Sequence, residues 1–161
     1  MGDETRGLAK LRFLVADDRD MLMLLIPFLQ EMGVTRIRRA TDGRAALDHL
    51  VHAGHEIDII ICDSELPKAN GLEVLKHVRR RFADKPFLML ASQVTRKSVA
   101  TARAHGVSAF LMKPFNAQAL KQRVHALAKM LSTTAPAPAT APATPPSDHN
   151  DSESDSDSWM I

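Results

Sequence analysis

The sequence predicts an α/β fold in which a doubly wound parallel sheet is packed between two layers of helices. Five short apolar segments alternate with five longer amphipathic segments over roughly the first 130 residues, a pattern typical of parallel sheets with crossover helices. Residues 57–62 and 87–91 are apolar almost throughout, which indicates strands buried on both faces. Charged residues follow several of the apolar segments, so one edge of the sheet is expected to carry charge.

Each expected strand is a short run rich in Val, Ile, Leu, Ala or Phe. The first run ends at two aspartates, and the second is the weakest because it contains three arginines. The fifth lies directly before a lysine–proline pair. The expected strands are residues 11–16, 36–40, 57–62, 87–91 and 109–112.

Helices are expected between the strands, where apolar residues recur at helical spacing and stop signals follow them. The helix over 20–33 ends at Gly33, and Pro27 is expected to kink it because proline has no amide donor. Asp42 is the expected N-cap of the second helix, and Gly106 follows the fourth. The remaining helices are indicated by the stripes Leu47, Leu50 and Val51; Leu75, Val78 and Phe82; and Leu120, Val124, Leu127 and Leu131.

The charge is divided unevenly along the 161 residues, although the formal net charge is only +2. The first 131 residues carry 21 − 14 = +7, and the last thirty carry −5 with no Lys or Arg among them. The composition also changes sharply after Leu131, to Ser, Thr, Ala and Pro and then to acids. The expected organisation is a flexible N-terminus over 1–9, a globular domain over 10–131, a Pro/Ala/Thr linker over 132–147 and a disordered acidic tail over 148–161.

Composition excludes several classes of protein. The single cysteine, Cys62, cannot form an internal disulfide, which favours a reducing compartment. The longest apolar stretch, 21–29, is shorter than the roughly 20 residues of a membrane span. The first residues lack the basic and apolar regions of a secretory signal. A cytoplasmic protein without a membrane span is therefore expected.

Three acids and a lysine lie where expected strands end. Asp17 and Asp18 follow the first strand, Asp63 follows the third, and Lys113 follows the fifth. Ligands of open parallel sheets bind at this edge, and clustered carboxylates need a hard cation such as Mg²⁺ or a raised pKa. Carboxylate nucleophile, metal and lysine are the parts needed for phosphoryl transfer to aspartate. The structural alternative is that Asp17 or Asp18 caps the first helix while Lys113 pairs with an acid.

These residues resemble the receiver domain of two-component response regulators, in particular the stand-alone chemotaxis (CheY-like) type. The resemblance covers the domain at 10–131 and rests on three motifs: the Asp17–Asp18 pair, the spacing of Asp63, Pro67 and Gly71, and the Lys113–Pro114–Phe115 run. It implies a flavodoxin-like (βα)5 sheet with strand order 2-1-3-4-5.

The resemblance assigns a role to each charged residue. Asp63 is the expected phosphoacceptor, and its carboxylate binds Mg²⁺ together with that of Asp18. The backbone carbonyl of Glu65 completes the protein ligands, and Asp17 holds a metal-bound water. Lys113 contacts the phosphoryl oxygens. Such a protein is no enzyme in the ordinary sense, since it catalyses only its own phosphorylation and dephosphorylation at Asp63.

Two further features concern the switch and the peptide bond after the lysine. The Lys113–Pro114 bond is expected to be cis, as is common in the family. Ala91 stands where the family usually has Thr or Ser, and Ser92 replaces that hydroxyl only if the strand has already ended. Phe110 occupies the switch aromatic position, with core packing as the alternative. Ala91 therefore puts in doubt the coupling of phosphate to the surface, although not the chemistry.

The leading hypothesis is a single-domain response regulator that receives its phosphoryl group from a histidine kinase or histidine phosphotransfer protein. Its output is expected through a downstream protein target or onward phosphotransfer, because no DNA-binding domain follows the receiver. The alternative is a switch-degraded receiver that acts as a binding scaffold independent of phosphorylation. A hydrolase with an aspartate nucleophile is a third interpretation, but the chain has no cap domain.

Three surface features admit two interpretations each. The first helix is either fully covered or exposes Met23, Leu24 and Phe28 to a helical phosphodonor or a second subunit. The arginine clusters at 36–39 and 79–81 are either solvated faces or sites for an acidic protein, a nucleotide or the chain's own tail. The tail itself either keeps the protein in solution or contacts a partner through Trp159, Met160 and Ile161.

Overall fold

The computed structural model describes residues 7–134 of the chain, with side chains for 7–131. Five strands form one sheet in which every neighbouring pair is parallel, in the order β2-β1-β3-β4-β5. This order confirms the flavodoxin-like arrangement. The strands are β1 (Arg12–Ala16), β2 (Arg36–Ala40), β3 (Ile59–Asp63), β4 (Phe87–Ala91) and β5 (Ala109–Met112).

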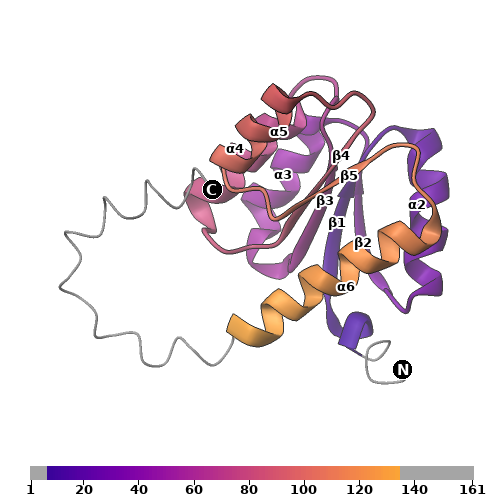
Figure 1. Ribbon diagram of the computed structural model, residues 1–161. Coiled ribbons are helices and arrows are strands. Elements are labelled where there is room, and N and C mark those ends of the chain that lie inside the picture. The colour runs from indigo at the N-terminus through magenta and orange to yellow at the C-terminus, as the bar shows by residue number, and fades with distance from the viewer. Residues whose placement is uncertain (1–6, 135–161) are drawn as a thin grey trace.

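The helices lie on both faces of the sheet (Figure 1), with α3, α4 and α5 on one face and α2 and α6 on the other. They are α2 (Arg19–Glu31), α3 (Gly43–Ala53), α4 (Gly71–Arg81), α5 (Arg96–Ala104) and α6 (Ala117–Thr134), and a short 3-10 turn η1 (Gly54–Glu56) follows α3. Within the described residues, no helix is both long enough and apolar enough to span a membrane.

Side chains cap the starts of α3, α4 and α5. Asp42, the predicted N-cap of α3, accepts a hydrogen bond from the Ala45 amide at 2.7 Å. The starts of α4 and α5 are closed by reciprocal side-chain and backbone bonds, Asn70 with Glu73 and Thr95 with Ser98. Each such cap satisfies amides that have no partner inside the helix and is typically worth about 1 kcal/mol.

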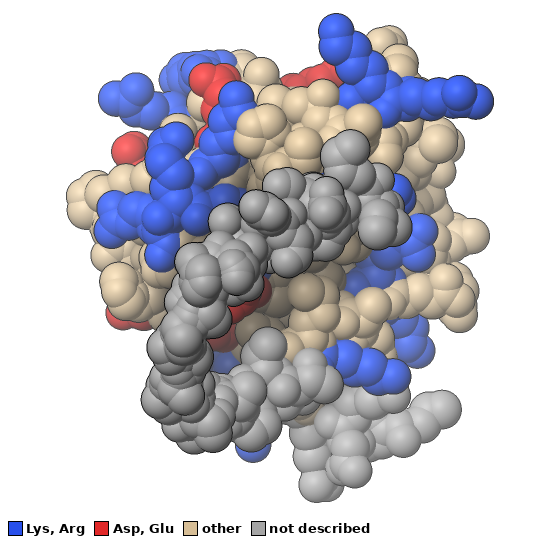
Figure 2. All heavy atoms as spheres, turned by 60° about the vertical axis from the view of Figure 1, so that its left-hand side comes forward, with Lys and Arg blue, Asp and Glu red and all other residues tan. Residues whose placement is uncertain are grey.

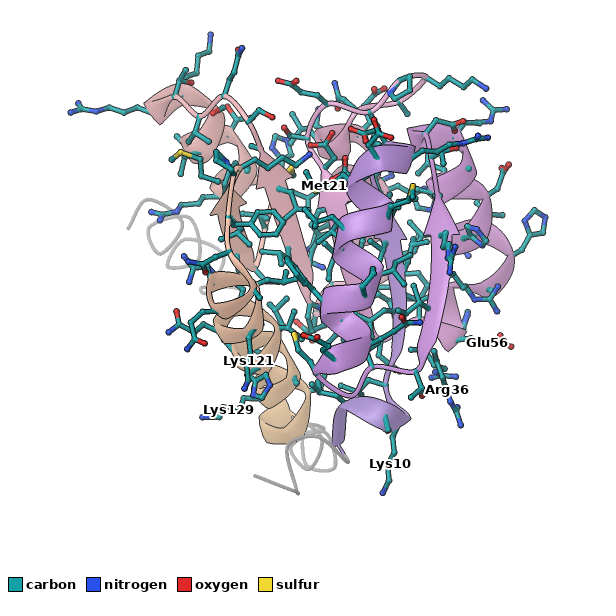
Figure 3. The ribbon with its side chains drawn as sticks, turned by 90° about the vertical axis from the view of Figure 1, so that its right-hand side faces the viewer. Lys10, Met21, Arg36, Glu56, Lys121 and Lys129 are labelled. Carbon is teal, nitrogen blue, oxygen red and sulfur yellow. The ribbon has the colours of Figure 1, made fainter. Side chains whose placement is uncertain are left out.

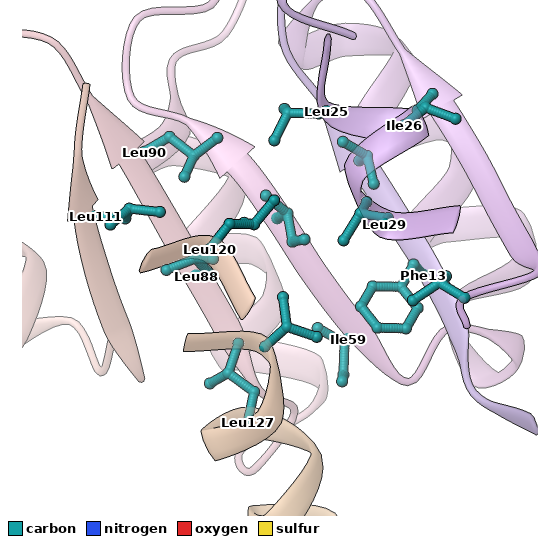
Figure 4. Close-up of a cluster of buried hydrophobic side chains, with 14 of the residues drawn as sticks. Phe13, Leu25, Ile26, Leu29, Ile59, Leu88, Leu90, Leu111, Leu120 and Leu127 are labelled. Carbon is teal, nitrogen blue, oxygen red and sulfur yellow. The ribbon is translucent and has the colours of Figure 1, made fainter. Parts of the chain in front are cut away.

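The alternation of side chains along the strands divides the core into two layers. On one face, Phe13, Ile59 and Leu88 pack against α2 and α6 (Figure 4), and each is fully buried. On the other face, Leu14 and Ile60 pack against α3, α4 and α5. Burial on both faces explains why these strands lack a polar alternation in the sequence.

Several expected boundaries differ in the structure. Residues 7–10 form a helical turn, and Leu8 is only 2% exposed, so the domain begins inside the expected flexible segment 1–9. At the other end, α6 continues to Thr134, three residues into the expected linker. The third strand begins at Ile59 rather than 57, because the Asp58 side chain binds the backbone and side chain of Arg12. The acidic tail 148–161, with Trp159, Met160 and Ile161, lies outside the described residues.

Helix α2 runs from Arg19 to Glu31 without a break at Pro27. Proline removes the amide that would bond the Met23 carbonyl, but Met23 is 76% exposed, so water can satisfy that group. Leu24 is also exposed, at 46%, whereas Phe28 packs partly buried against the core. Of the two interpretations of this helix, exposure therefore holds for Met23 and Leu24, whereas Phe28 is partly covered.

The loop that follows β3 rests on the first turn of α3. The Gly43 amide donates to the Pro67 carbonyl at 3.0 Å, and Lys68 lies 3.5 Å from the Asp42 carboxylate. The approach is so close that a Cβ on Gly43 would lie 1.7 Å from the Ala69 carbonyl oxygen. Gly43 is thus the residue that allows this loop to lie against α3.

We expect Gly43→Ala to lower the free energy of unfolding by about 1–3 kcal/mol, because the new methyl group must push the loop backbone away. Urea unfolding measures the change. Gly7→Ala is the matched control, since a Cβ there meets nothing within 4 Å, and it is expected to be nearly neutral. Equal stability of the two variants would contradict the packing of the loop on α3.

Candidate functional site

Three charged side chains meet at the carboxyl edge of the sheet. Asp17 directly follows β1, Asp63 ends β3, and Lys113 directly follows β5. β1 and β3 are neighbours and Ala16 pairs with Cys62, so the next residues, Asp17 and Asp63, leave the sheet side by side. Figure 3 shows carboxylate oxygens at this edge, near Met21, whereas Lys10, Arg36 and Lys129 lie toward the opposite end.

Lys113 holds the two carboxylates together. Its Nζ lies 3.0 Å from Oδ2 and 3.1 Å from Oδ1 of Asp17, and 3.1 Å from Oδ1 of Asp63. The Lys113 amide donates to the Ala91 carbonyl at 2.8 Å, and the Lys113–Pro114 peptide bond is cis. Asp17 is completely buried and Asp63 is 7% exposed, so a ligand reaches the site from the Asp63 side.

Burial and charge oppose each other at Asp17. Burial raises the pKa of Asp17 to about 6; the Lys113 hydrogen bond opposes this rise, and the charge of Asp63 adds to it. For Lys113, burial disfavours the ammonium form, but the hydrogen bonds and charges of Asp17 and Asp63 outweigh it and raise the pKa. When both acids are ionised, the two carboxylates and the one ammonium group give the site a net charge of −1.

The site fits a hard divalent cation. The Oδ2 atom of Asp17 is buried and accepts no hydrogen bond within the described residues, and its charged neighbour is the Lys113 Nζ at 3.0 Å. No three His, Cys, Asp or Glu side chains within the described residues lie close enough to form a complete cage. Mg²⁺ needs none, because it typically binds one or two carboxylates and keeps several waters. Two neighbouring carboxylates whose charge one lysine only partly neutralises therefore suit it.

Asp18 has a second role that its position in the sequence left open. Its Oδ1 accepts a hydrogen bond from the Met21 amide at 2.8 Å and caps α2. Its own amide donates to Oδ1 of Asp17 at 2.8 Å. The alternative that an aspartate of the pair caps the first helix therefore holds for Asp18. Its Oδ1 is used by the cap, so only its Oδ2 is left to face a cation.

The loop after Asp63 is shaped by close backbone contacts. The Ser64 amide donates to the Leu90 carbonyl at 2.8 Å, and the Gly71 amide donates to the Ser64 carbonyl at 3.1 Å. A Cβ on Gly71 would lie 2.5 Å from the Asp63 carbonyl oxygen, which explains a glycine eight residues after the acid. Glu65, the expected carbonyl ligand, is exposed in this loop.

The three switch positions lie in or just beyond β4 and β5, and none of their side chains belongs to the charged cluster. Ala91 ends β4 and is 2% exposed, whereas Ser92 is exposed beyond the end of the strand. Phe110 is partly buried against the core. A cavity of about 340 Å³ is bordered by Ala91, Phe110, Met89 and Thr101. Ala91 and Phe110 thus line the same cavity, and the small side chain of Ala91 fills little of it.

One member of the arginine clusters is structural rather than part of a solvated face. Arg79 is half-buried and donates to the carbonyls of Gly106, Phe82 and Lys85 at 2.8–3.2 Å. Nothing in the local sequence separates it from Arg80 and Arg81, because its partners lie in later segments. The cavity beside Ala91 was missed for the same reason, since its walls come from several segments.

We expect Asp17→Asn to stabilise the metal-free protein, and to do so more at pH 7.5 than at pH 4.5. Because the folded-state pKa of Asp17 is raised, its ionisation reduces stability as the pH rises from about 4 to about 6. The gain of the variant at neutral pH is therefore about 1–3 kcal/mol. Urea unfolding in the presence of a chelator measures it.

Asp48→Asn is the control, because Asp48 is an exposed carboxylate on α3. It is expected to change stability little at either pH. Destabilisation by Asp17→Asn at pH 7.5, or a gain that does not grow with pH, would contradict the burial of an ionisable Asp17.

Known proteins share this fold and sequence. The family model of the response regulator receiver domain matches residues 13–125. Chemotaxis protein CheY of Pseudomonas aeruginosa is 31% identical over 117 residues, which cover 71% of this chain and 93% of CheY. Chemotaxis protein CheY4 of Vibrio cholerae superposes with a TM-score of 0.65 at 28% identity, over 73% of this chain and 98% of that one.

A complex of CheX and CheY with BeF3 and Mg²⁺ from Borrelia burgdorferi is a further neighbour, with a TM-score of 0.72. It covers 77% of this chain and 97% of its own, but the identity is 22%, so it supports the fold alone. The family match goes further, since residues 13–125 include the strand ends that carry Asp17, Asp63 and Lys113. The chain therefore belongs to the response regulator receiver domain family of two-component signalling.

Proposed function

We propose that this chain is a single-domain response regulator that accepts a phosphoryl group on Asp63 from a phosphohistidine donor, in a reaction that requires Mg²⁺. The donor is a histidine kinase or a histidine phosphotransfer protein. The observation that carries the proposal is the bridge made by Lys113, which holds Asp63 at the mouth of the site beside the buried Asp17. Such a bridge prepares positive charge next to a carboxylate nucleophile.

In the proposed step, a carboxylate oxygen of Asp63 attacks the phosphorus atom while the phosphorus–nitrogen bond of the donor breaks. The imidazole leaves with the bonding electron pair and is neutral once it keeps or gains a proton. The product is an acyl phosphate on Asp63. Oδ1 of Asp63 is bound by Lys113, so Oδ2 is the oxygen assigned to attack. Lys113 then faces phosphoryl oxygens as well as Asp17.

Asp63 and the second oxygen of Asp18 would bind Mg²⁺, with the Glu65 carbonyl as a further ligand, and Asp17 would hold a metal-bound water. When bound, the ion supplies positive charge that neutralises carboxylate and phosphoryl oxygens. The buried Oδ2 of Asp17, which accepts no hydrogen bond within the described residues, supports this assignment. The presence of Mg²⁺ and BeF3 in the Borrelia CheX–CheY complex is in keeping with it.

The proposed output is contact with a downstream protein. Residues 132–161 carry no Lys or Arg and five acids, a composition unsuited to binding DNA. The Borrelia CheY is bound to a protein, CheX, in its complex. The proposal places the chain in the cytoplasm, in keeping with Cys62, which is a buried free thiol.

A second function, a scaffold that binds its partner regardless of phosphorylation, is supported by one observation. Ala91 offers no hydroxyl to a phosphoryl group, and a cavity lies between it and Phe110. A chain with this arrangement can keep the chemistry of Asp63 and still fail to transmit it.

We expect acetyl phosphate with Mg²⁺ to add one phosphoryl group to the wild-type protein, as measured by intact-mass spectrometry. Asp63→Asn is expected to lower the labelled fraction by at least about tenfold, since the nucleophile is lost. Asp48→Asn is the matched control and is expected to label normally. Equal labelling of Asp63→Asn, or labelling that is unchanged by a chelator, would overturn the proposal.

The scaffold alternative is tested by comparing the wild type with Ala91→Thr. The cavity beside Ala91 gives the added atoms room, so the substitution is expected to change stability by less than about 1.5 kcal/mol. On adding beryllofluoride and Mg²⁺, amide chemical shifts of the wild type should change near Asp63 and little at Phe110. In Ala91→Thr the changes should extend to Phe110 and α5. Large changes at Phe110 in the wild type would remove the scaffold alternative.

A further inference from the structure

A basic groove lies at the end of the sheet opposite to Asp63. It has a volume of about 1160 Å³ and lies between the C-terminal ends of α4 and α5, the residues that precede β5, and Met130 of α6. Its charged lining comprises Lys76, Arg79, Arg80 and Arg103, with Asp84 as the single acid. The lining therefore has a net charge of 4 − 1 = +3 when His105 is neutral. We call this feature the basic groove.

The cations of the basic groove lack acidic partners within the described part of the chain. No carboxylate of residues 7–131 lies within 4.0 Å of a nitrogen of Lys76, Arg80 or Arg103, all of which are exposed. Figure 2 shows many Lys and Arg side chains and few acids on the side of the molecule where α4 and α5 lie. This distribution creates an electrostatic potential that attracts an anionic segment.

Arg79 adds a half-buried charge to the basic groove. Its guanidinium donates to the carbonyls of Gly106, Phe82 and Lys85 and to the Ser108 hydroxyl. Burial lowers its pKa, and the nearby Asp84 opposes the change. Carbonyls satisfy the donors of Arg79 without cancelling its charge, so an anion above it gains more than it would at a fully solvated site.

The chain itself contains a segment with the complementary charge. Residues 148–158 carry five acids and no Lys or Arg. Helix α6 ends at Thr134, and residues 135–147 connect it to this segment. Thirteen extended residues reach at most about 45 Å, so the acids can return to a groove that includes Met130, about one turn before the end of α6. Tethering of this kind gives an effective concentration on the order of millimolar.

We propose that the acidic segment 148–158 of this chain binds in the basic groove, with its carboxylates facing Lys76, Arg80 and Arg103. The apolar residues Trp159, Met160 and Ile161 are then held at the rim, where Val107 and Met130 contribute apolar surface. The site is far from Asp63 along the strands, so this contact does not depend on the proposed phosphorylation. It makes the basic groove unavailable to other anionic partners until salt or a competitor displaces the segment.

The full-length protein reports on this contact, because Trp159 is its only tryptophan and it has no tyrosine. We expect acrylamide quenching of Trp159 to be about twofold weaker at about 20 mM salt than at about 0.5 M, where screening is effective within about 4 Å. Amide chemical shifts of Gly106, Val107 and Ser108 should change over the same range of salt. Neutralising the segment with D151N, E153Q, D155N and D157N should remove both effects.

The matched variants locate the binding site. Arg80→Glu with Arg103→Glu should raise low-salt quenching of Trp159 to its high-salt value. The control variant, Arg36→Glu with Arg44→Glu, makes the same change in net charge on β2 and α3, away from the basic groove. It should leave the low-salt quenching of Trp159 at the wild-type value. Circular dichroism checks folding, and Lys76→Glu is a milder variant expected to act in the same direction.

Each outcome decides the proposal. The proposal is overturned if acrylamide quenches Trp159 equally in the wild type and in the variant with Arg80→Glu and Arg103→Glu. The acidic segment would then not bind in the basic groove. It is also overturned if protection of Trp159 rises with protein concentration, because the segment would then bind a second copy. Salt-dependent protection that is independent of concentration and lost only in the groove and segment variants supports it.

Discussion

Lys113 places one ammonium group between two carboxylates that come from different strands, and the rest of the site depends on this contact. Like charges about 4 Å apart repel by about 4 kcal/mol at an effective dielectric of 20. Asp17 and Asp63 therefore need the lysine to remain together at a buried edge. The parallel sheet makes the meeting possible, because it brings the carboxyl ends of β1, β3 and β5 to one side. The single ammonium group cannot neutralise both carboxylates, and this remaining negative charge makes the site receptive to a cation.

The loop from Asp63 to α4 is fixed by backbone contacts that tolerate no Cβ. Gly43 lets it lie on α3, and Gly71 lets the chain turn back under the Asp63 carbonyl. Lys68 takes a positive φ of 70° at the tip of the loop and faces the carboxylate of the N-cap Asp42. These contacts fix the backbone of the loop at Asp63, whereas Lys113 holds the carboxylate of Asp63. The reactive carboxylate is thus set by packing in the loop as well as by charge.

Sequence patterns predicted those parts of the fold whose causes are local. Strands β4 and β5 begin and end where their apolar runs do, and Asp42 is the N-cap of α3 that the sequence predicted. The start of β3 was misplaced because Asp58 is held by Arg12, 46 positions away. The sequence did not reveal three other features for the same reason. They are the contact of Lys113 with both oxygens of Asp17, the hydrogen bonds of Arg79, and the cavity beside Ala91. Each of these depends on side chains that only the folded sheet brings together.

Ala91 bears on the response of the surface to phosphorylation but not on the arrangement of the charged side chains at Asp63. The charged cluster contacts Ala91 only through its backbone, where the carbonyl accepts from the Lys113 amide. Changing its side chain therefore leaves the arrangement of Asp17, Asp63 and Lys113 intact. Ala91 and Phe110 both border the same cavity, and the methyl group of Ala91 offers no hydroxyl that could link a phosphoryl group on Asp63 to Phe110 and α5. The chemistry of the site and the response of the surface are thus set by different residues in this chain, even though they lie on adjacent strands.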